Sequence, residues 1–221
     1  MSKKIICIDA GHGGYDSGAV NKSRYEKNDN LKITTLLMEI LKTQGFEVVL
    51  TRTEDKETSL QKRVEIAHQA NADVFISLHR NAFTNCFACG VENWIYQNTD
   101  EKSKLLAQFI LNEITSVGVQ KNRGVKSGNF YVLRTTKMPA CLLELGFISN
   151  QQDNIVFDTN IENYAVAIAK GICNYFKMPY TKKAHDQYYR VQVGAFESKE
   201  KAENLAQELK SKGYPAMIIV T

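Results

Sequence analysis

The sequence lacks long hydrophobic runs and contains little proline. No stretch approaches the roughly 20 consecutive apolar residues that a membrane-spanning helix requires, so we expect no membrane span. Only 3 prolines occur in 221 residues, which argues against a disordered or linker-rich chain. With 43% hydrophobic and 24% charged residues, the composition is that of a globular protein with one core of ordinary size.

The first residues also lack the features of a secretory signal peptide. The apolar run Ile5–Ile8 is short and leads directly into Asp9, without a small-residue cleavage site behind it. We therefore expect synthesis in the cytoplasm, so that any action outside the cell requires another route of release.

Cysteine is scarce, and its five positions show no framework of disulfides. Cys7, Cys141 and Cys173 lie in apolar runs and are expected in the core. Cys86 and Cys89 form a single Cys-x-x-Cys pair, which without a second pair is a weak signal for metal binding or redox chemistry. Few, scattered cysteines without a disulfide framework are typical of a protein from a reducing compartment.

Strand-like and helix-like segments alternate through the first three-quarters of the chain. Apolar strands that alternate with amphipathic helices predict an α/β domain with helices on both faces of the sheet. The alternating pattern of 91–96 is typical of an edge strand. The expected strands are 4–10, 46–51, 73–79, 91–96, 130–134 and 140–145, and the expected helices are 30–43, 60–70, 102–117 and 161–176.

The pattern breaks at a polar segment, which divides the chain into a domain over 1–177, a linker over 178–187 and a small unit over 188–221. The small unit is expected to contain a strand at 188–193, a helix at 199–212 and a strand at 216–220. A single β-α-β piece of this size buries too little apolar surface to be stable alone, so we expect it to need a partner.

Polar residues occur at the ends of three predicted buried strands. His12 follows the first strand, His79 ends the third, and Glu144 lies in the strand 140–145. In α/β sheets, functional sites gather where the carboxyl ends of strands meet loops. The shared position of these residues is the main indication of a site.

Two histidines and one carboxylate would provide the three protein ligands of an open zinc site. Glu26, just ahead of a predicted helix, is the best placed of several carboxylates. His68, within a helix, is interpreted as a surface or boundary residue, and His185 as a solvated linker residue. From spacing alone, a structural role for the two strand-end histidines stays open.

Glu144 is a single carboxylate inside the otherwise apolar run Cys-Leu-Leu-Glu-Leu-Gly-Phe-Ile. Burial of a charge is unfavourable unless the charge is paired or used, and it raises the pKa of a carboxyl group. A carboxylate beside a metal-activated water is what general-base catalysis requires. A solvent-facing position on an edge strand is disfavoured because both neighbours are apolar.

Several motifs together resemble the zinc-dependent N-acetylmuramoyl-L-alanine amidases of the amidase-3 type. The likeness runs in the order and approximate spacing of that family through most of 3–176. Besides Glu26, it is carried by Ile-Asp-Ala-Gly-His-Gly-Gly at 8–14, Leu-Thr-Arg at 50–52, Ser-Leu-His-Arg-Asn-Ala at 77–82 and Leu-Glu-Leu-Gly-Phe-Ile-Ser-Asn at 143–150.

The resemblance implies that His12, Glu26 and His79 bind Zn²⁺ and that Glu144 is the catalytic carboxylate. It further implies a mostly parallel six-stranded sheet, and cleavage of the peptidoglycan amide bond between N-acetylmuramic acid and L-alanine. Arg80 departs from the family, in which a small or apolar residue is more usual, and this raises a question about the rim of the substrate site.

The tail resembles the opening of a sporulation-related repeat, or SPOR domain. Such domains bind glycan strands stripped of peptide and consist of two β-α-β halves that share one sheet, whereas 188–221 contains one half. We hypothesise a homodimer in which each chain supplies half of a wall-binding domain. The alternative is a degenerate tail that packs on its own catalytic domain.

Two other functions stay open, namely a zinc endopeptidase that acts within the stem peptide and a non-catalytic wall-binding protein. The expected partner is peptidoglycan, without nucleic acid. The net charge of +4 suits an anionic wall, although ordinary solvated charge explains it equally.

Release through a phage pore or by lysis of a mother cell would bring the protein to the wall, and we favour a phage endolysin over a sporulation autolysin.

Overall fold

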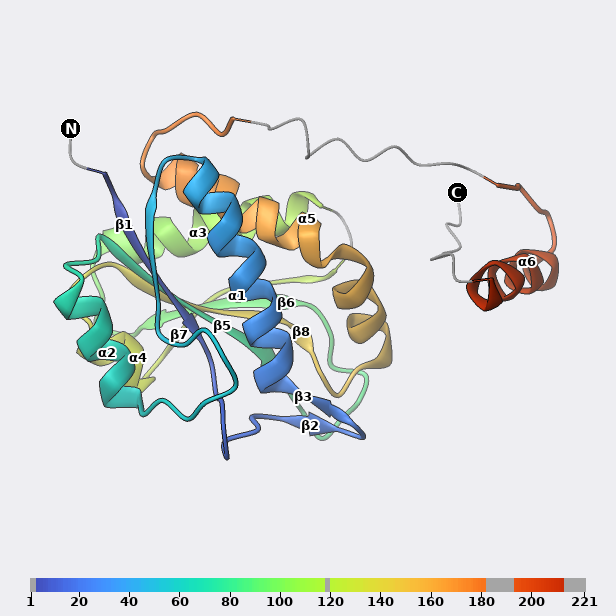
Figure 1. Cartoon of the computed structure of the whole chain (residues 1–221), viewed down its shortest axis with the longest axis horizontal. Helices are drawn as coiled ribbons and strands as arrows, with labels where there is room; N and C mark the ends of the chain where they lie inside the picture. Colours follow the sequence, from blue (N-terminus) through green and yellow to red (C-terminus); the bar gives the residue numbers. More distant parts are fainter. Residues whose placement is uncertain (1–2, 118–119, 182–192, 213–221) are drawn as a thin grey trace. The chain divides into compact units, whose positions relative to one another are not determined.

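The computed structural model describes residues 3–117, 120–181 and 193–212. The chain divides into two compact units, Met1–Thr181 and Lys182–Thr221 (Figure 1). The boundaries predicted for the linker (178–187) and for the small unit (188–221) remain predictions. His185 and the tail strand predicted at 216–220 lie outside the described residues, as does the strand predicted at 188–193 apart from Val193.

The first unit contains a six-stranded sheet in the order β4-β1-β5-β8-β6-β7. The first four strands of this order are mutually parallel, β6 is antiparallel to β8, and β7 is parallel to β6. This arrangement confirms the predicted α/β fold with a mostly parallel sheet. The strands are β1 (Ile5–Ala10), β4 (Glu47–Leu50), β5 (Val74–Asn81), β6 (Val91–Tyr96), β7 (Asn122–Gly128) and β8 (Ala140–Phe147).

Helices cover both faces of this sheet (Figure 1). One face packs against α1 (Glu26–Thr43), α3 (Glu101–Ser116) and α5 (Gln151–Tyr175). The other face packs against α2 (Leu60–Gln69) and the short α4 (Tyr131–Thr135). Because both faces are covered, the central strands are mostly apolar, and their polar residues lie mainly toward their carboxyl ends. The predicted core cysteines Cys7, Cys141 and Cys173 are buried, as expected.

Side-chain caps define where three of these helices begin. Ser59, Asp100 and Asn150 accept hydrogen bonds from the backbone N–H groups three residues further on, at the starts of α2, α3 and α5. The cap at Asn150 starts α5 ten residues before the predicted start at 161. The helix therefore begins directly after the motif that contains Glu144.

Four features of the local structure differ from the predictions. Residues 130–134 form the single turn of α4 rather than a strand, because Val132 and Leu133 pack toward α2, and so short an apolar run does not distinguish the two. The polar β7 was missed, since its lysine and arginine are typical of an exposed edge strand. β6 is consequently an interior strand, and α1 begins at Glu26 itself.

Two smaller elements complete the description. The strands β2 (Val20–Asn21) and β3 (Arg24–Tyr25) form a hairpin just before α1. In the second unit, α6 (Lys199–Ser211) agrees closely with the predicted helix at 199–212. Within the described part of the chain, no helix combines the length and apolarity needed to cross a membrane.

Candidate active site

A cleft of about 510 Å³ opens at the carboxyl ends of β1, β5 and β8. Parallel strands end together at this edge, so residues distant in the sequence meet there. The start of α2 and the start of α4 form two of its walls. Its lining includes His12, Glu26, Leu60, His79, Phe130 and Glu144.

Three of the predicted site residues converge in this cleft. Ligand atoms of His12, Glu26 and His79 all lie within 4.8 Å of one another. His12 Nε2 is 3.2 Å from Glu26 Oε2, and His79 Nδ1 is 2.8 Å from Glu26 Oε1. The carboxylate thus stands between two imidazoles, which meet edge to face with their centroids 4.8 Å apart.

The Glu26 carboxylate is held rigidly at the start of α1. Its Oε2 accepts from the backbone N–H of Ala19 at 2.9 Å, and its Oε1 accepts from the backbone N–H of Arg80 at 3.0 Å. The side-chain amide of Asn30 adds a longer contact of 3.3 Å. Burial alone would raise the pKa of Glu26, but hydrogen bonds from the two histidines hold it far below its usual value. The group is therefore an anion.

His12 is oriented by a second carboxylate that the sequence analysis missed. Its Nδ1 is 2.8 Å from Asp16 Oδ2, which leaves Nε2 to face Glu26. The desolvation of His12 lowers its pKa, but Glu26 and Asp16 together raise it. The signal in the sequence was the four-residue spacing from His12 to Asp16 across a glycine-rich turn, where Gly13 and Asp16 exchange two backbone hydrogen bonds.

Two buried arginines hold the backbone that carries His12. Arg63 donates to the carbonyls of Ala10 and His12 at 2.7 and 2.8 Å, and Arg52 donates to those of Ala10 and Gly11 at 2.8 and 2.9 Å. This support fixes His12 in a left-handed conformation with φ 61°, which is unusual for a residue other than glycine. Arg63 was not predicted from the sequence as a residue of the site.

Two glycines leave room for the ligand side chains. A β-carbon at Gly11 would lie 2.3 Å from Cε1 and Nε2 of His79. A β-carbon at Gly18 would lie 2.5 Å from Cδ2 of His12 and 2.6 Å from Oε2 of Glu26, and Gly18 also has φ 63°. Both glycines are therefore required by close packing against the three converging side chains.

Glu144 lies directly across the sheet from the second histidine. It pairs in register with His79 of the neighbouring strand, and it lines the cleft. Its Oε2 atom is buried and has no hydrogen-bond partner among the described residues. Burial raises the pKa of Glu144 well above its ordinary value, and the negative charges of Glu26 and Glu92 raise it further. Such a carboxyl group can exchange a proton with a reactant in the cleft.

Arg80 belongs to the lining of the cleft, but its charged group is turned into the protein interior. Its guanidinium is buried, donates to Asp29 Oδ2 at 2.6 Å, and lies 4.2 Å from the centre of the Phe157 ring. The guanidinium of this unusual residue therefore makes its contacts with Asp29 and Phe157 in the interior beside the site. His68 is half-buried and accepts from the backbone N–H of Lys137 at 3.2 Å, in keeping with a boundary residue.

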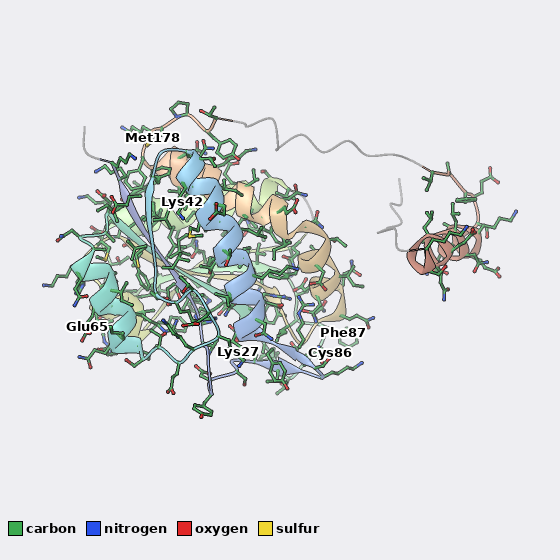
Figure 2. All side chains as sticks on the ribbon, viewed as in Figure 1. Lys27, Lys42, Glu65, Cys86, Phe87 and Met178 are labelled. Atoms are coloured by element: carbon green, nitrogen blue, oxygen red, sulfur yellow. The ribbon has the colours of Figure 1, made fainter. Side chains whose placement is uncertain are left out.

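The loop that carries Cys86 and Cys89 lies outside the cleft lining. Figure 2 shows Cys86 and the adjoining Phe87 at the end of the first unit that carries the β2–β3 hairpin. Cys86 is exposed and its carbonyl accepts from the side chain of Asn150 at 2.8 Å, while Cys89 is half-buried. Neither cysteine joins His12 or the other converging ligands.

The donor set fits a divalent metal ion, and zinc in particular. Two imidazole nitrogens and one carboxylate oxygen are a usual ligand set of catalytic zinc, which keeps a further coordination position open. The buried anionic Glu26 between two imidazoles would be neutralised by such an ion. The hydrogen bond from His12 to Asp16 is the outer support that metal-binding histidines typically have.

Comparisons with known proteins agree with this geometry. The chain matches the Amidase_3 family, N-acetylmuramoyl-L-alanine amidase, over residues 6–174, and the SPOR domain family over residues 166–221. It is 35% identical to the N-acetylmuramoyl-L-alanine amidase CwlM of Bacillus licheniformis over 97% of this chain and 84% of that protein. It is 33% identical to the sporulation-specific N-acetylmuramoyl-L-alanine amidase of Bacillus subtilis, again over 97% and 84%.

A solved structure shares the fold as well as the sequence. The catalytic domain of CwlV, an N-acetylmuramoyl-L-alanine amidase from Bacillus (Paenibacillus) polymyxa, superposes with a TM-score of 0.75 at 36% identity. The match covers 80% of this chain and 99% of that one. The first unit therefore corresponds to a complete catalytic domain of this kind.

Proposed function

The chain belongs to the N-acetylmuramoyl-L-alanine amidase family Amidase_3 and carries a SPOR domain, and from this membership we propose that it is a zinc-dependent amidase of peptidoglycan. The bond cleaved is the amide between N-acetylmuramic acid and the L-alanine of the stem peptide. The observation that supports the zinc assignment is the convergence of ligand atoms of His12, Glu26 and His79 within 4.8 Å of one another on the lining of the cleft.

In this proposal, zinc would be held by His12 through Nε2, by Glu26, and by His79. When bound, it would polarise the scissile carbonyl and lower the pKa of a water molecule. The residues around it keep the ligands in place, since Asp16 fixes the ring of His12 and two backbone N–H groups fix Glu26.

Glu144 is the proposed catalytic carboxylate. Its position in register with His79, on the lining of the cleft, supports this role. Glu144 accepts a proton from the attacking water and then delivers that proton to the nitrogen of the departing L-alanine. A carboxyl group with a raised pKa holds the proton between the two steps, so one residue serves both.

Mass spectrometry of digested wall tests the proposed bond. Purified peptidoglycan is incubated with the full chain, and the soluble products are analysed. We expect intact stem peptides that begin with L-alanine, together with glycan that retains its muramic acid carboxyl. Fragments cut within the stem peptide would instead identify an endopeptidase, and the absence of products from folded, zinc-containing protein would identify a non-catalytic wall-binding protein.

Metal removal tests the zinc assignment separately. Dialysis against a chelator is expected to abolish product release, and one equivalent of Zn²⁺ should restore it. Elemental analysis should then find one zinc for each chain. Full activity in protein that contains no zinc would contradict the assignment.

The SPOR domain binds peptidoglycan, and we propose that two chains combine their tails to do so. In α6, Ala202, Leu205, Ala206 and Leu209 recur at helical spacing and are only half-buried within the described part of the second unit. A second copy of the same unit would cover this face.

Release of the protein by lysis or through a phage pore remains a prediction from the sequence.

A further inference from the structure

Four polar side chains form a row across neighbouring strands of the sheet. His79 in β5 pairs in register with Glu144 in β8, and Glu144 pairs in register with Glu92 in β6. Directly opposed residues have their side chains on the same face, with β-carbons about 5 Å apart. Arg123 in β7 reaches Glu92 from the far side, with Nε at 2.6 Å from Oε2. Two carboxylates therefore stand side by side, and one of them, Glu144, lines the cleft.

The two carboxylates are hydrogen-bonded very differently. Glu92 is 1% exposed, and its Oε1 accepts from Asn81 at 2.8 Å and from the Trp94 indole at 3.0 Å. Its Oε2 accepts from Arg123 and from the ammonium group of Lys126. Glu144, by contrast, has a buried oxygen without a partner in the described parts of the chain. Both oxygens of Glu92 therefore accept hydrogen bonds, whereas Oε2 of Glu144 accepts none from the described residues.

Lys126 is the group that could fill this open position. Its ammonium is a point charge on a flexible stem, so it can turn to a new partner without movement of the backbone. It already acts on Glu144 through space, since its charge lowers the pKa of that carboxyl. If Glu92 lost its charge, Glu144 would be the adjacent buried carboxylate with a vacant acceptor.

We propose that Glu92 is a positioning residue that holds the ammonium group of Lys126 away from the catalytic carboxylate Glu144. The inference rests on the proposed function, because it assumes that Glu144 must accept a proton. An ion pair between Lys126 and Glu144 would occupy the carboxylate oxygen that the attacking water needs. Glu92 prevents this pair while it also neutralises two half-buried cations, Arg123 and Lys126.

A double-mutant cycle on the full, zinc-loaded chain tests the inference. The release of L-alanine amino groups from purified peptidoglycan is measured for Glu92→Gln, Lys126→Met and the double variant. Glu92→Gln should lower kcat at least tenfold with zinc content unchanged. Lys126→Met alone should stay within threefold of the wild type. The double variant should recover to within threefold of the wild type, because the competing cation is gone.

The recovery separates positioning from simple structural support. If Glu92 only stabilised the fold, the double variant would be at least as impaired as Glu92→Gln, and this result would overturn the inference. Should Glu92→Gln fail to fold, as judged by thermal melting, Glu92→Met/Lys126→Met removes the whole pair at once. That variant is expected to be active, and a folded but inactive protein would refute the positioning role.

Different results would overturn the amidase activity and the positioning role of Glu92. A wild-type protein that contains zinc yet releases no L-alanine amino groups would overturn the proposed function, and this inference with it. An active wild type whose Glu92→Gln variant is equally active would overturn the inference alone.

Discussion

The imidazole of His79 lies against Gly11 so closely that a β-carbon on the glycine would stand 2.3 Å from two ring atoms. The glycine cannot retreat, because its N–H donates to Leu78 O at 3.1 Å and its carbonyl accepts from Arg52 at 2.9 Å. The position of this proposed metal ligand therefore depends on the absence of a side chain at Gly11, directly after the neighbouring strand β1.

Gly11→Ala is accordingly expected to displace the His79 ring and to weaken zinc binding about 10-fold or more, the scale of disturbed outer-shell contacts. Competition with a chromophoric chelator measures the affinity. Gly45→Ala is the control, since no atom lies within 4 Å of its β-carbon position although φ is +89°. The control should lose some stability but keep its zinc affinity. Equal zinc affinity in Gly11→Ala and the wild type would contradict this account.

Asp16→Ala removes the acceptor that orients His12. Without the 2.8 Å contact to Nδ1, the ring can rotate and change its tautomer, so we expect zinc affinity to fall about 10- to 100-fold. Isothermal titration of the metal-free protein with Zn²⁺ measures the loss. Glu39→Ala, which removes an exposed acid from α1, should leave the affinity unchanged. A similar loss in both variants would indicate a general charge effect instead.

Glu144→Gln keeps the shape of the proposed catalytic side chain but removes its ability to accept a proton. We expect kcat to fall by roughly 100- to 10,000-fold while zinc is retained. Assays on purified peptidoglycan, paired with elemental analysis, measure both quantities. Glu113→Gln, on the distant helix α3, should behave as the wild type does. Near-normal turnover in Glu144→Gln would remove Glu144 from the mechanism.

Asp9 should make the stability of the fold depend on acid pH. Burial would raise its pKa, but the charge of Arg63 and hydrogen bonds from Ser77 and Thr51 lower it below the ordinary value. The folded state therefore favours the ionised form. This contribution to stability is complete above the unfolded-state pKa of about 4 and is lost as the pH falls through the folded-state pKa.

Asp9→Asn leaves the buried Arg63 without its anion, so we expect a loss of about 3–5 kcal/mol in the free energy of unfolding at pH 7. The difference from the wild type should narrow as the pH falls below 4. Urea unfolding at several pH values checks both points. Asp73→Asn removes a more exposed pair with Lys4 and should cost only about 0–1 kcal/mol. If the difference in the free energy of unfolding between Asp9→Asn and the wild type stayed constant with pH, the lowered pKa of Asp9 would be contradicted.

Leu205→Asp would place a charge on the half-buried face of α6. If two chains pair through this face, light scattering at micromolar concentration should show a dimer for the wild type and a monomer for the variant. Gln207→Asp adds the same charge on the exposed face and should stay dimeric. A monomeric wild type would count against pairing and favour a tail that folds without a second chain.

Much of the fold was predictable because its helices and central strands carry strong local patterns. The buried strand of Ile5–Ala10 and the helix of Leu60–Gln69 were placed to within about one residue. The failures have a common cause, which is that short or peripheral elements are selected by tertiary packing. The single turn at Tyr131–Thr135 and the polar strand Asn122–Gly128 have no distinctive periodicity of their own.

The sequence by itself determined which residues stand at the ends of buried strands. His12 and His79 were identifiable because a polar residue at the end of an apolar run is a local feature of the chain, and Glu144 because it is a lone carboxylate inside such a run. The motifs around these residues resemble those of a zinc amidase family, which indicated zinc binding for the two histidines and catalysis for Glu144.

Only the tertiary structure decided how those residues meet. The parallel order of β1, β5 and β8 brings His79 and Glu144 into register, and the start of α1 places Glu26 between the two imidazoles. The support that Arg63 gives to the backbone of His12, and the close fit of Gly11 against His79, were likewise visible only in three dimensions. Such contacts depend on distances of a few ångströms between segments far apart in the chain, and no local pattern encodes those distances.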